Sequence, residues 1–237
     1  MDKRGNTLPC AGSDIKQFIF KNTERTTTPL VPEVQLRLLK PESDLWCAFD
    51  HEADFSHIQR PYWAFAWSGG QSLARYILDN PDLVKAKCIL DFASGCGIAA
   101  LAAAKTGAAS VLASDIDPVA ICAIAINGRI NDVVVNTECK DLIFSENRGW
   151  DLILAGDIWY TTRLSRHGLN WLRKLAGEGS TVLAADPGRQ FSPSRGLRPL
   201  TTYAVRSVPD VDHPGFQKVC VSRILPLEDS ANAFNVL

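Results

Sequence analysis

A short glycine-containing loop between an apolar run and an alanine-rich run constrains the fold of this chain most. Residues 88–92 read Cys-Ile-Leu-Asp-Phe and predict a buried strand. Residues 97–105 predict a helix that Gly107 closes in the left-handed conformation. Between them, Gly95 and Gly97 let the backbone approach a ligand, and the helix start presents free N–H groups. A strand, a glycine turn and a helix in this order predict the first unit of a parallel α/β sheet.

The same alternation of strands and helices continues towards the C-terminus. Asp117 and Pro118 suit the N-cap and first position of a helix that runs towards Asn127. A second helix is expected over residues 162–176. Further strands are expected at residues 110–114, 133–139, 150–155, 181–185, 201–208 and 218–225. No helix separates the last two strands. The order predicts an α/β fold with a doubly wound, seven-stranded, mostly parallel Rossmann-like sheet and an antiparallel C-terminal strand pair.

Residues 1–67 precede this alternation and are expected to form an N-terminal extension, or lid, over the pocket of a domain at residues 68–237. The apolar spacing of residues 68–79 predicts a helix that stops before Pro81. A short helix is expected between Pro32 and Pro41. Residues 44–54 receive no assignment.

Composition excludes several classes of protein. The net charge of −1 supplies no basic field that would recruit nucleic acid, and an acidic or mixed protein surface or a small molecule is the expected partner. No apolar run approaches the roughly 20 residues that span a bilayer. The seven cysteines form no CxxC pair, which is typical of reduced thiols in a cytoplasmic protein without a metal site. We expect a monomer with four scattered surface histidines, namely His51, His57, His167 and His213.

Acidic residues at the ends of the predicted strands suggest a nucleotide cofactor. Asp115 lies 20 residues after Gly95, where a carboxylate can accept hydrogen bonds from two ribose hydroxyls. The alternative is a surface carboxylate at a strand end. Ile116 is assigned to the same cofactor site. Asp141 is expected to accept from the adenine amino group, or to be a loop carboxylate. The glycine loop alone also fits the fingerprint of a nicotinamide-dependent oxidoreductase.

An acidic residue ahead of the glycine loop argues against a nicotinamide-dependent oxidoreductase. Asp91 stands four residues before Gly95 and gives Asp-x-Ala-x-Gly-x-Gly. This pattern resembles the motif of class I methyltransferases, with Ala93 where the family has its first glycine. The resemblance implies that Asp91, Ala93, Gly95 and Gly97 hold the methionine end of S-adenosyl-L-methionine (AdoMet).

A second motif narrows the family. Asp157-Ile-Trp-Tyr160 resembles the (D/E)xx(Y/F) signature of seven-β-strand protein lysine methyltransferases. Residues 60–70 and the turn at residues 186–189 resemble the branch that methylates the electron transfer flavoprotein β subunit. The resemblance spans roughly residues 29–225.

The resemblance implies roles for individual residues. Asp157 would orient the lysine amine, with its own backbone carbonyl and the Tyr160 hydroxyl completing the acceptor pocket. Trp67 would border the AdoMet pocket, or else be a core residue at a hinge. Trp63 would share a face with Trp67 if both are helical.

Other functions remain open from sequence. The substrate could be ribosomal protein L11, another protein or a small-molecule amine. More distant alternatives are an NAD-dependent oxidoreductase and a non-catalytic AdoMet-binding module. The C-terminal region is locally basic, either as a solvated face or as a surface for an acidic partner, through Arg189, Arg195, Arg198 and Arg206.

Overall fold

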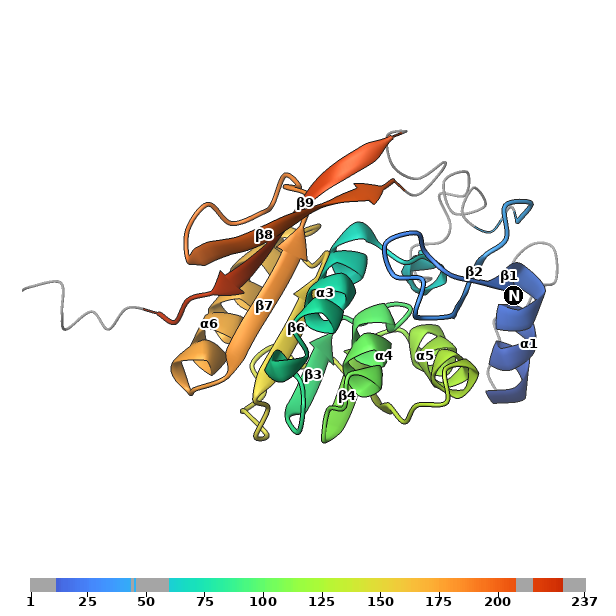
Figure 1. Cartoon of the computed structure of the whole chain (residues 1–237), viewed down its shortest axis with the longest axis horizontal. Helices are drawn as coiled ribbons and strands as arrows, with labels where there is room; N and C mark the ends of the chain where they lie inside the picture. Colours follow the sequence, from blue (N-terminus) through green and yellow to red (C-terminus); the bar gives the residue numbers. More distant parts are fainter. Residues whose placement is uncertain (1–11, 44, 46–59, 208–214, 228–237) are drawn as a thin grey trace, which may run out of the picture.

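The computed structural model describes residues 12–43, 45, 60–207 and 215–227. A seven-stranded sheet forms its centre, in the order β5-β4-β3-β6-β7-β9-β8 (Figure 1). Neighbouring strands from β5 to β7 are parallel, whereas β9 is antiparallel to both β7 and β8. The strands are β3 (Cys88–Phe92), β4 (Ser110–Asp115), β5 (Asn136–Cys139), β6 (Leu152–Gly156), β7 (Thr181–Asp186), β8 (Leu197–Arg206) and β9 (Phe216–Ile224). The predicted sheet is therefore confirmed.

Alternate residues of the central strands serve two apolar layers. Leu152 and Leu154 of β6 pack into the layer beneath α3 and α4, whereas Ile153 and Ala155 pack into the layer beneath α6. A strand buried on both faces reads as a continuous apolar run, which is why these strands could be recognised in the sequence.

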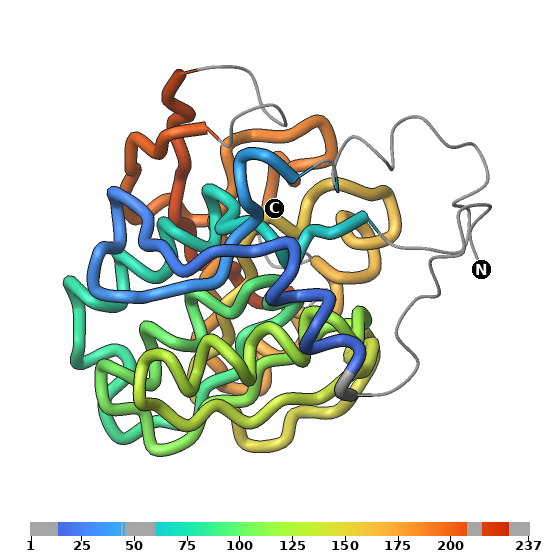
Figure 2. Tube along the Cα trace, turned by 90° about the vertical axis from the view of Figure 1, so that its right-hand side faces the viewer, coloured from blue at the N-terminus to red at the C-terminus, as the bar shows by residue number. Residues whose placement is uncertain are grey.

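The helices lie on both faces of the sheet. Helices α3 and α4 cover one face and α6 the other, while α1 packs against α5 at the side (Figures 1 and 2). Asp117 caps α5 by accepting from the Val119 N–H at 2.8 Å, and Gly107 adopts φ +91°, both as predicted. The helices are α1 (Gly12–Asn22), α3 (Ser68–Asp79), α4 (Ile98–Lys105), α5 (Pro118–Ile130) and α6 (Leu169–Gly177), with single turns η1 (Tyr62–Ala64), η2 (Pro81–Leu83) and the π-helical η3 (Leu164–Gly168).

The N-terminal region differs from the prediction. The short helix expected between Pro32 and Pro41 is wrong: Leu36–Leu39 is strand β2, which pairs antiparallel with β1 (Thr23–Thr26). The side chains of α5 hold this hairpin, because the Arg37 N–H donates to Asn127 Oδ1 at 2.8 Å. The same Asn127 donates from Nδ2 to the Cys96 carbonyl at 3.0 Å, which links the hairpin to the glycine loop.

Two predicted elements have different ends. The strand expected at residues 133–139 begins only at Asn136, since Val134 is largely exposed and the Val133 N–H is bonded to the Gly128 carbonyl. Strand β8 begins at Leu197, four residues before the predicted start. The five described cysteines carry free thiols, and His167 is exposed, whereas His51, His57, His213, Cys10 and Cys47 lie outside the described residues. In the described part of the chain, no helix is long and apolar enough to cross a membrane.

Candidate functional site

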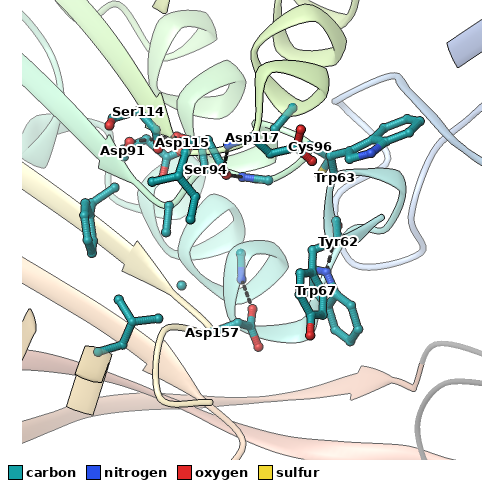
Figure 3. Close-up of a pocket in the computed structure, with 18 of the residues that line it drawn as sticks. Tyr62, Trp63, Trp67, Asp91, Ser94, Cys96, Ser114, Asp115, Asp117 and Asp157 are labelled. Atoms are coloured by element: carbon teal, nitrogen blue, oxygen red, sulfur yellow. Dashed lines mark hydrogen bonds between the residues drawn. The ribbon is translucent and has the colours of Figure 1, made fainter. Parts of the chain in front are cut away.

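A cavity of about 770 Å³ opens where β3, β4 and β6 end (Figure 3). The parallel strands deliver their carboxyl ends to one edge of the sheet, so residues distant in sequence meet there. Nine of the ten residues predicted for the cofactor and catalytic sites line this cavity: Trp67, Asp91, Ala93, Gly95, Asp115, Ile116, Asp141, Asp157 and Tyr160.

Gly97 is the predicted residue that does not line the cavity. It precedes α4 with φ +81°, and an added Cβ would lie 2.9 Å from Ile124 Cγ1. Its glycine character is explained by the left-handed backbone and by the close packing of α4 against α5. A direct contact of Gly97 with a cofactor stays a prediction.

Ala93 occupies a backbone conformation that favours glycine. Its φ is +54°, which for a residue with a Cβ costs about 1–2 kcal/mol relative to the right-handed region. The loop therefore keeps the shape that a glycine would allow, despite the alanine. Strain of this kind, held in place by surrounding structure, is common at ligand-binding sites.

Asp91 lies buried beneath the glycine loop. Its Oδ2 accepts from the Ala100 N–H of α4 at 3.1 Å. Burial raises the pKa of Asp91 to about 7, although the hydrogen bonds from Ala100 and Ser94 oppose the shift. The carboxylate is therefore poised to ionise fully when a cationic group arrives.

Asp115 shapes the loop from the end of β4. One carboxylate oxygen accepts from the Gly95 N–H at 2.9 Å and the other from the Asp117 N–H at 3.0 Å. Burial raises the pKa of Asp115, and burial likewise raises the pKa of Asp117 to about 6. Each Asp115 oxygen retains a lone pair that can accept from a ligand hydroxyl.

Ile116 and Asp141 form the part of the cavity wall beyond Asp115. The Ile116 side chain is half exposed, as suits a residue that covers a flat apolar ligand. Asp141 already has partners: Oδ1 accepts from the Ile143 N–H at 3.0 Å, and Oδ2 pairs with Arg163 Nη2 at 2.5 Å. A ligand amino group would have to share Asp141 with Arg163.

Three aromatic side chains stand at the mouth of the cavity. The ring centroid of Tyr62 lies 5.8 Å from that of Trp67 and 5.6 Å from that of Tyr160. The Trp67 indole N–H donates to the Tyr62 carbonyl at 2.9 Å, which fixes the orientation of the indole ring (Figure 3). Tyr62 and Tyr160 remain 39% and 43% exposed, so both can still receive a ligand.

Trp63 and Trp67 do not meet the condition for sharing one helical face. Trp63 belongs to the turn η1, whereas Trp67 precedes α3 in an extended conformation. Trp63 is buried and packs with the Phe18 ring, at a centroid distance of 6.2 Å. It mainly contributes to the apolar cluster between η1, α1 and α5.

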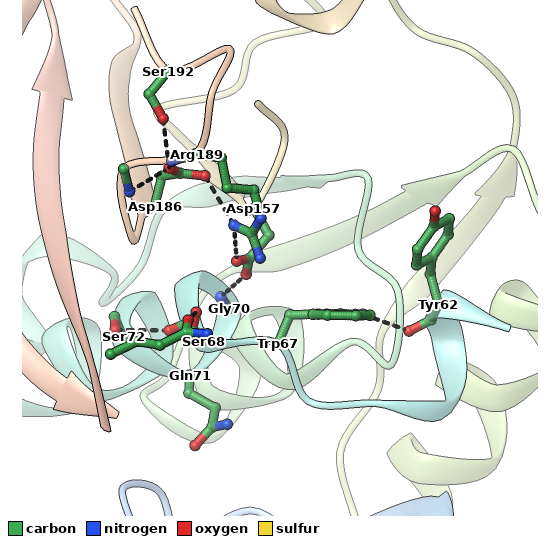
Figure 4. A network of polar contacts seen from close by, with 12 residues as sticks. Tyr62, Trp67, Ser68, Gly70, Gln71, Ser72, Asp157, Asp186, Arg189 and Ser192 are labelled. Atoms are coloured by element: carbon green, nitrogen blue, oxygen red, sulfur yellow. Dashed lines mark hydrogen bonds and ion pairs between the residues drawn. The ribbon is translucent and has the colours of Figure 1, made fainter. Parts of the chain in front are cut away.

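The Asp157 carboxylate is held from two sides, by the start of α3 and by the turn after β7 (Figure 4). Its Oδ2 accepts from the Gly70 N–H at the start of α3, at 2.9 Å. Its Oδ1 pairs with Arg189 Nη1 at 2.7 Å, and the same Nη1 reaches Asp186 Oδ2 at 2.9 Å. Both carboxylate oxygens of Asp157 are therefore engaged in the structure.

Glycines allow the start of α3 to contact the end of β6. A Cβ on Gly69 would lie 2.3 Å from the Ala185 carbonyl oxygen and 2.6 Å from Asp157 Oδ2. A Cβ on Gly156 would lie 2.8 Å from the Gly70 nitrogen. Asp157 itself has φ +57°, a rare conformation for a residue with a side chain. The close approach puts the carboxylate at the positive end of a helix dipole.

The charges around Asp157 oppose one another. Burial raises the pKa of Asp157, Arg189 and the Gly70 N–H lower it, and Asp186 raises it further. Burial alone would lower the pKa of Arg189, but the two carboxylates outweigh it and the net shift is upward. Arg189 is therefore a permanent cation that neutralises a buried acidic pair.

Three features of the site were missed by the sequence reasoning: the pairing of Arg189 with Asp157, the contact of Tyr62 with Tyr160, and the fit of α3 against β6. The signals were the turn at residues 186–189 and the consecutive glycines Gly69 and Gly70. In the described residues, no group of three or more histidine, cysteine, aspartate or glutamate side chains could hold a metal ion.

The sequence of this chain is similar to those of known methyltransferases. Residues 72–158 match the family model described as ribosomal protein L11 methyltransferase (PrmA). The chain is 42% identical over 196 residues to the electron transfer flavoprotein beta subunit lysine methyltransferase of Xenopus laevis, covering 80% of this chain and 78% of the relative. It is 44% identical over 183 residues to the protein of the same name from Homo sapiens, covering 76% and 69%.

The fold is also found among solved structures. The tRNA (uracil-54, C5)-methyltransferase of Pyrococcus abyssi, in complex with S-adenosyl-L-homocysteine, superposes with a TM-score of 0.51 at 17% identity. The match covers 86% of this chain and 44% of that one. At this identity the likeness concerns the fold alone.

Proposed function

This chain belongs to the family of electron transfer flavoprotein β subunit lysine methyltransferases, and from that premise we propose that it methylates lysine side chains of that subunit, with AdoMet as the methyl donor. One observation of the structure supports the proposal more than any other: a single cavity joins the glycine loop and Asp115 to Asp157 and Tyr160. A methyl donor and its acceptor must meet in one enclosed space, and this cavity offers one.

The residues of the cavity fit AdoMet. The volume of about 770 Å³ lies within the range of roughly 300–1,000 Å³ that is typical of small-molecule sites. Asp115 keeps lone pairs for two ribose hydroxyls, and the half-exposed Ile116 can cover the adenine. The buried Asp91, with its pKa near 7, suits the ammonium of the methionine end. When bound, AdoMet supplies a methyl group activated by a sulfonium.

On the acceptor side, we assign the contacts with the lysine amine to the Tyr160 hydroxyl and the Asp157 backbone carbonyl. Burial raises the pKa of Tyr160 to about 12, so the phenol stays neutral and its oxygen can accept from an N–H. The Asp157 carboxylate is already held by Arg189 and Gly70, and its main role is to fix the backbone of residues 157–160. This refines the role of Asp157 expected from the sequence motif.

The aromatic rings at the mouth define a path for the lysine side chain. Tyr62 and Tyr160 face each other and are both partly exposed. Their faces can contact the aliphatic stem and attract an ammonium or methylammonium head by cation–π interaction. Tyr62 and Trp67 come from the N-terminal extension, which supports the role of residues 1–67 as part of the pocket.

The proposal is tested by incubating the purified chain with methyl-labelled AdoMet and, in separate reactions, the electron transfer flavoprotein β subunit and ribosomal protein L11. We expect label on lysine of the flavoprotein subunit only, located by mass spectrometry. Asp157→Ala should abolish transfer and leave AdoMet binding largely intact, because the proposed contacts with AdoMet come from Asp91, Asp115 and Ile116. Label on L11 alone, or full activity of Asp157→Ala, would contradict the proposal.

The location and oligomeric state belong to the same proposal. We propose a cytoplasmic enzyme, because the cysteines are odd in number and form no CxxC pair, and we propose that it is a monomer. A thermal-shift comparison of AdoMet with NAD separates the methyltransferase from the oxidoreductase alternative, since only the true cofactor raises the melting temperature.

A further inference from the structure

The C-terminal strand pair carries a charge pattern that the methyl-transfer chemistry does not use. Described residues 187–207 and 215–227 contain no aspartate or glutamate, whereas Asp210 and Asp212 belong to the connection at residues 208–214, outside the described residues. They contain six cations: Arg189, Arg195, Arg198, Arg206, Lys218 and Arg223. Except for Arg189, none of these six forms an ion pair with another described residue.

Part of this charge lies on one exposed face of the strand pair. In the register of β8 with β9, Arg206 stands opposite Phe216 and Ala204 opposite Lys218. Side chains two apart on a strand point to the same face, so these four residues, with Thr202, share a face. All five are exposed, and the Phe216 side chain is 75% exposed. We call Thr202, Ala204, Arg206, Phe216 and Lys218 the hairpin face.

The hairpin face begins next to the candidate active site. A second hollow, of about 320 Å³, is lined by Pro187, Gly188, Arg189, Gln217 and Lys218. Arg189 lines this hollow as well as the main cavity, so the two spaces adjoin. Strand β8 is the outermost strand of the sheet, with β9 on one side and no described strand on the other (Figure 1). A protein that inserts a lysine into the cavity would therefore lie beside Lys218.

We propose that the hairpin face docks a carboxylate-bearing surface of the methyl-accepting protein, so that the substrate is recognised as a folded surface as well as by its lysine. This inference rests on the proposed function. An exposed phenylalanine flanked by cations matches the composition of protein interfaces, in which an aromatic anchor is surrounded by charges that select the partner. Among the described residues, Arg206 and Lys218 have no ion-pair partner, so both can pair with carboxylates across such an interface.

A protein surface suits the hairpin face better than a nucleic acid. Binding to a phosphate backbone relies on several cations in register along the strand. The hairpin face offers two, Arg206 and Lys218, on a chain that is slightly acidic overall. The arrangement favours a local contact with a few carboxylates.

The experiment measures steady-state methylation of the electron transfer flavoprotein β subunit by the full chain and by the double variant R206E/K218E. We expect KM for the protein substrate to rise about tenfold or more at low salt, which corresponds to about 1.4 kcal/mol or more. The turnover number at saturation and the Kd for AdoMet should not change. The KM of the wild type should rise with salt, and that of the variant should depend on salt much less.

The matched control is K85E/K105E, which makes the same change of charge at two exposed lysines outside the hairpin and the cavity. It should leave KM within about twofold of the wild type. The milder pair R206Q/K218Q should raise KM by less than the reversal, and F216A should raise it without altering the salt dependence. The thermal midpoints of all variants are recorded to establish that they fold.

The outcomes separate the two proposals. If the wild type does not methylate the flavoprotein subunit, the proposed function fails and this inference with it. If the wild type is active but R206E/K218E keeps its KM, or K85E/K105E raises KM equally, the docking inference alone is overturned. It is also overturned if RNA inhibits the wild type and R206E/K218E removes that inhibition, because the hairpin face would then bind nucleic acid.

Discussion

Replacing Arg189 by methionine should destabilise the protein through the two carboxylates that the cation now neutralises. Arg189 Nη1 lies 2.7 Å from Asp157 Oδ1 and 2.9 Å from Asp186 Oδ2. The side chains of Arg189, Asp157 and Asp186 are only 22%, 11% and 7% exposed, so water cannot fully replace the cation. Removing one partner of a buried ion pair typically costs about 3–5 kcal/mol. We expect R189M to lower the free energy of unfolding by that amount at pH 8.

The loss should depend on pH in a defined direction. Burial already raises the pKa of Asp157, and the loss of Arg189 removes the largest influence that lowers it. A carboxylic acid whose pKa is higher in the folded than in the unfolded state favours folding at pH values below its unfolded pKa, and this contribution is lost as the pH rises through the folded pKa. The deficit of R189M should therefore be smaller at pH 5 than at pH 8.

Urea unfolding followed by tryptophan fluorescence measures these differences. The matched control is R195M, because Arg195 is exposed and has no ion pair among the described residues, and its effect should stay within about 0.5 kcal/mol. In a double-mutant cycle, D157N/R189M should lose at least about 1 kcal/mol less than the sum of the single variants. Additive losses, or an R189M effect no larger than that of R195M, would refute the role of Arg189 as the neutralising cation.

Three further predictions concern other parts of the site. Asn127→Leu should lower the free energy of unfolding by about 2–4 kcal/mol, because it leaves the Arg37 N–H and the Cys96 carbonyl without their partner; urea unfolding measures the loss, and an unchanged midpoint would argue against it. Asp115→Asn should raise the Kd for AdoMet about 10–100-fold in titration calorimetry, since hydrogen bonds to a charged acceptor contribute about 1.5–3 kcal/mol. Burial raises the pKa of Asp91 to about 7, so ionisation of Asp91 above that pH opposes folding of the AdoMet-free wild type. Asp91→Asn removes this ionisation, and the free energy of unfolding of the variant minus that of the wild type should be about 3 kcal/mol higher at pH 8 than at pH 5. A difference that does not depend on pH would contradict that pKa.

The fold could be predicted from sequence where burial is two-sided. Strands such as Leu152–Gly156 are apolar throughout and are bounded by polar or turn residues, so their pattern is local. The N-terminal hairpin could not be predicted, because β1 reads Thr-Glu-Arg-Thr and has no apolar alternation. Its position depends on the amides of Asn127 and Asn131, which lie about ninety residues further along the chain. Long-range polar contacts of this kind leave no periodic trace in the sequence.

In the site, too, individual residues could be identified from the sequence, but their interaction partners could not. Strand ends singled out Asp115 and Asp157, which both line the cavity, but not Arg189, the partner that makes a buried Asp157 tolerable. The parallel register pairs Gly156 with Ala185, so the next residue of each strand is an aspartate, and two like charges meet at one edge of the sheet. Such a pair requires a cation nearby, and Arg189 is the first cation after Asp186, in the turn that follows. An aspartate directly after one strand and another at the end of its neighbour are therefore a usable signal: once β6 and β7 are placed side by side, the two charges require a cation, and Arg189 is the nearest one in sequence to Asp186.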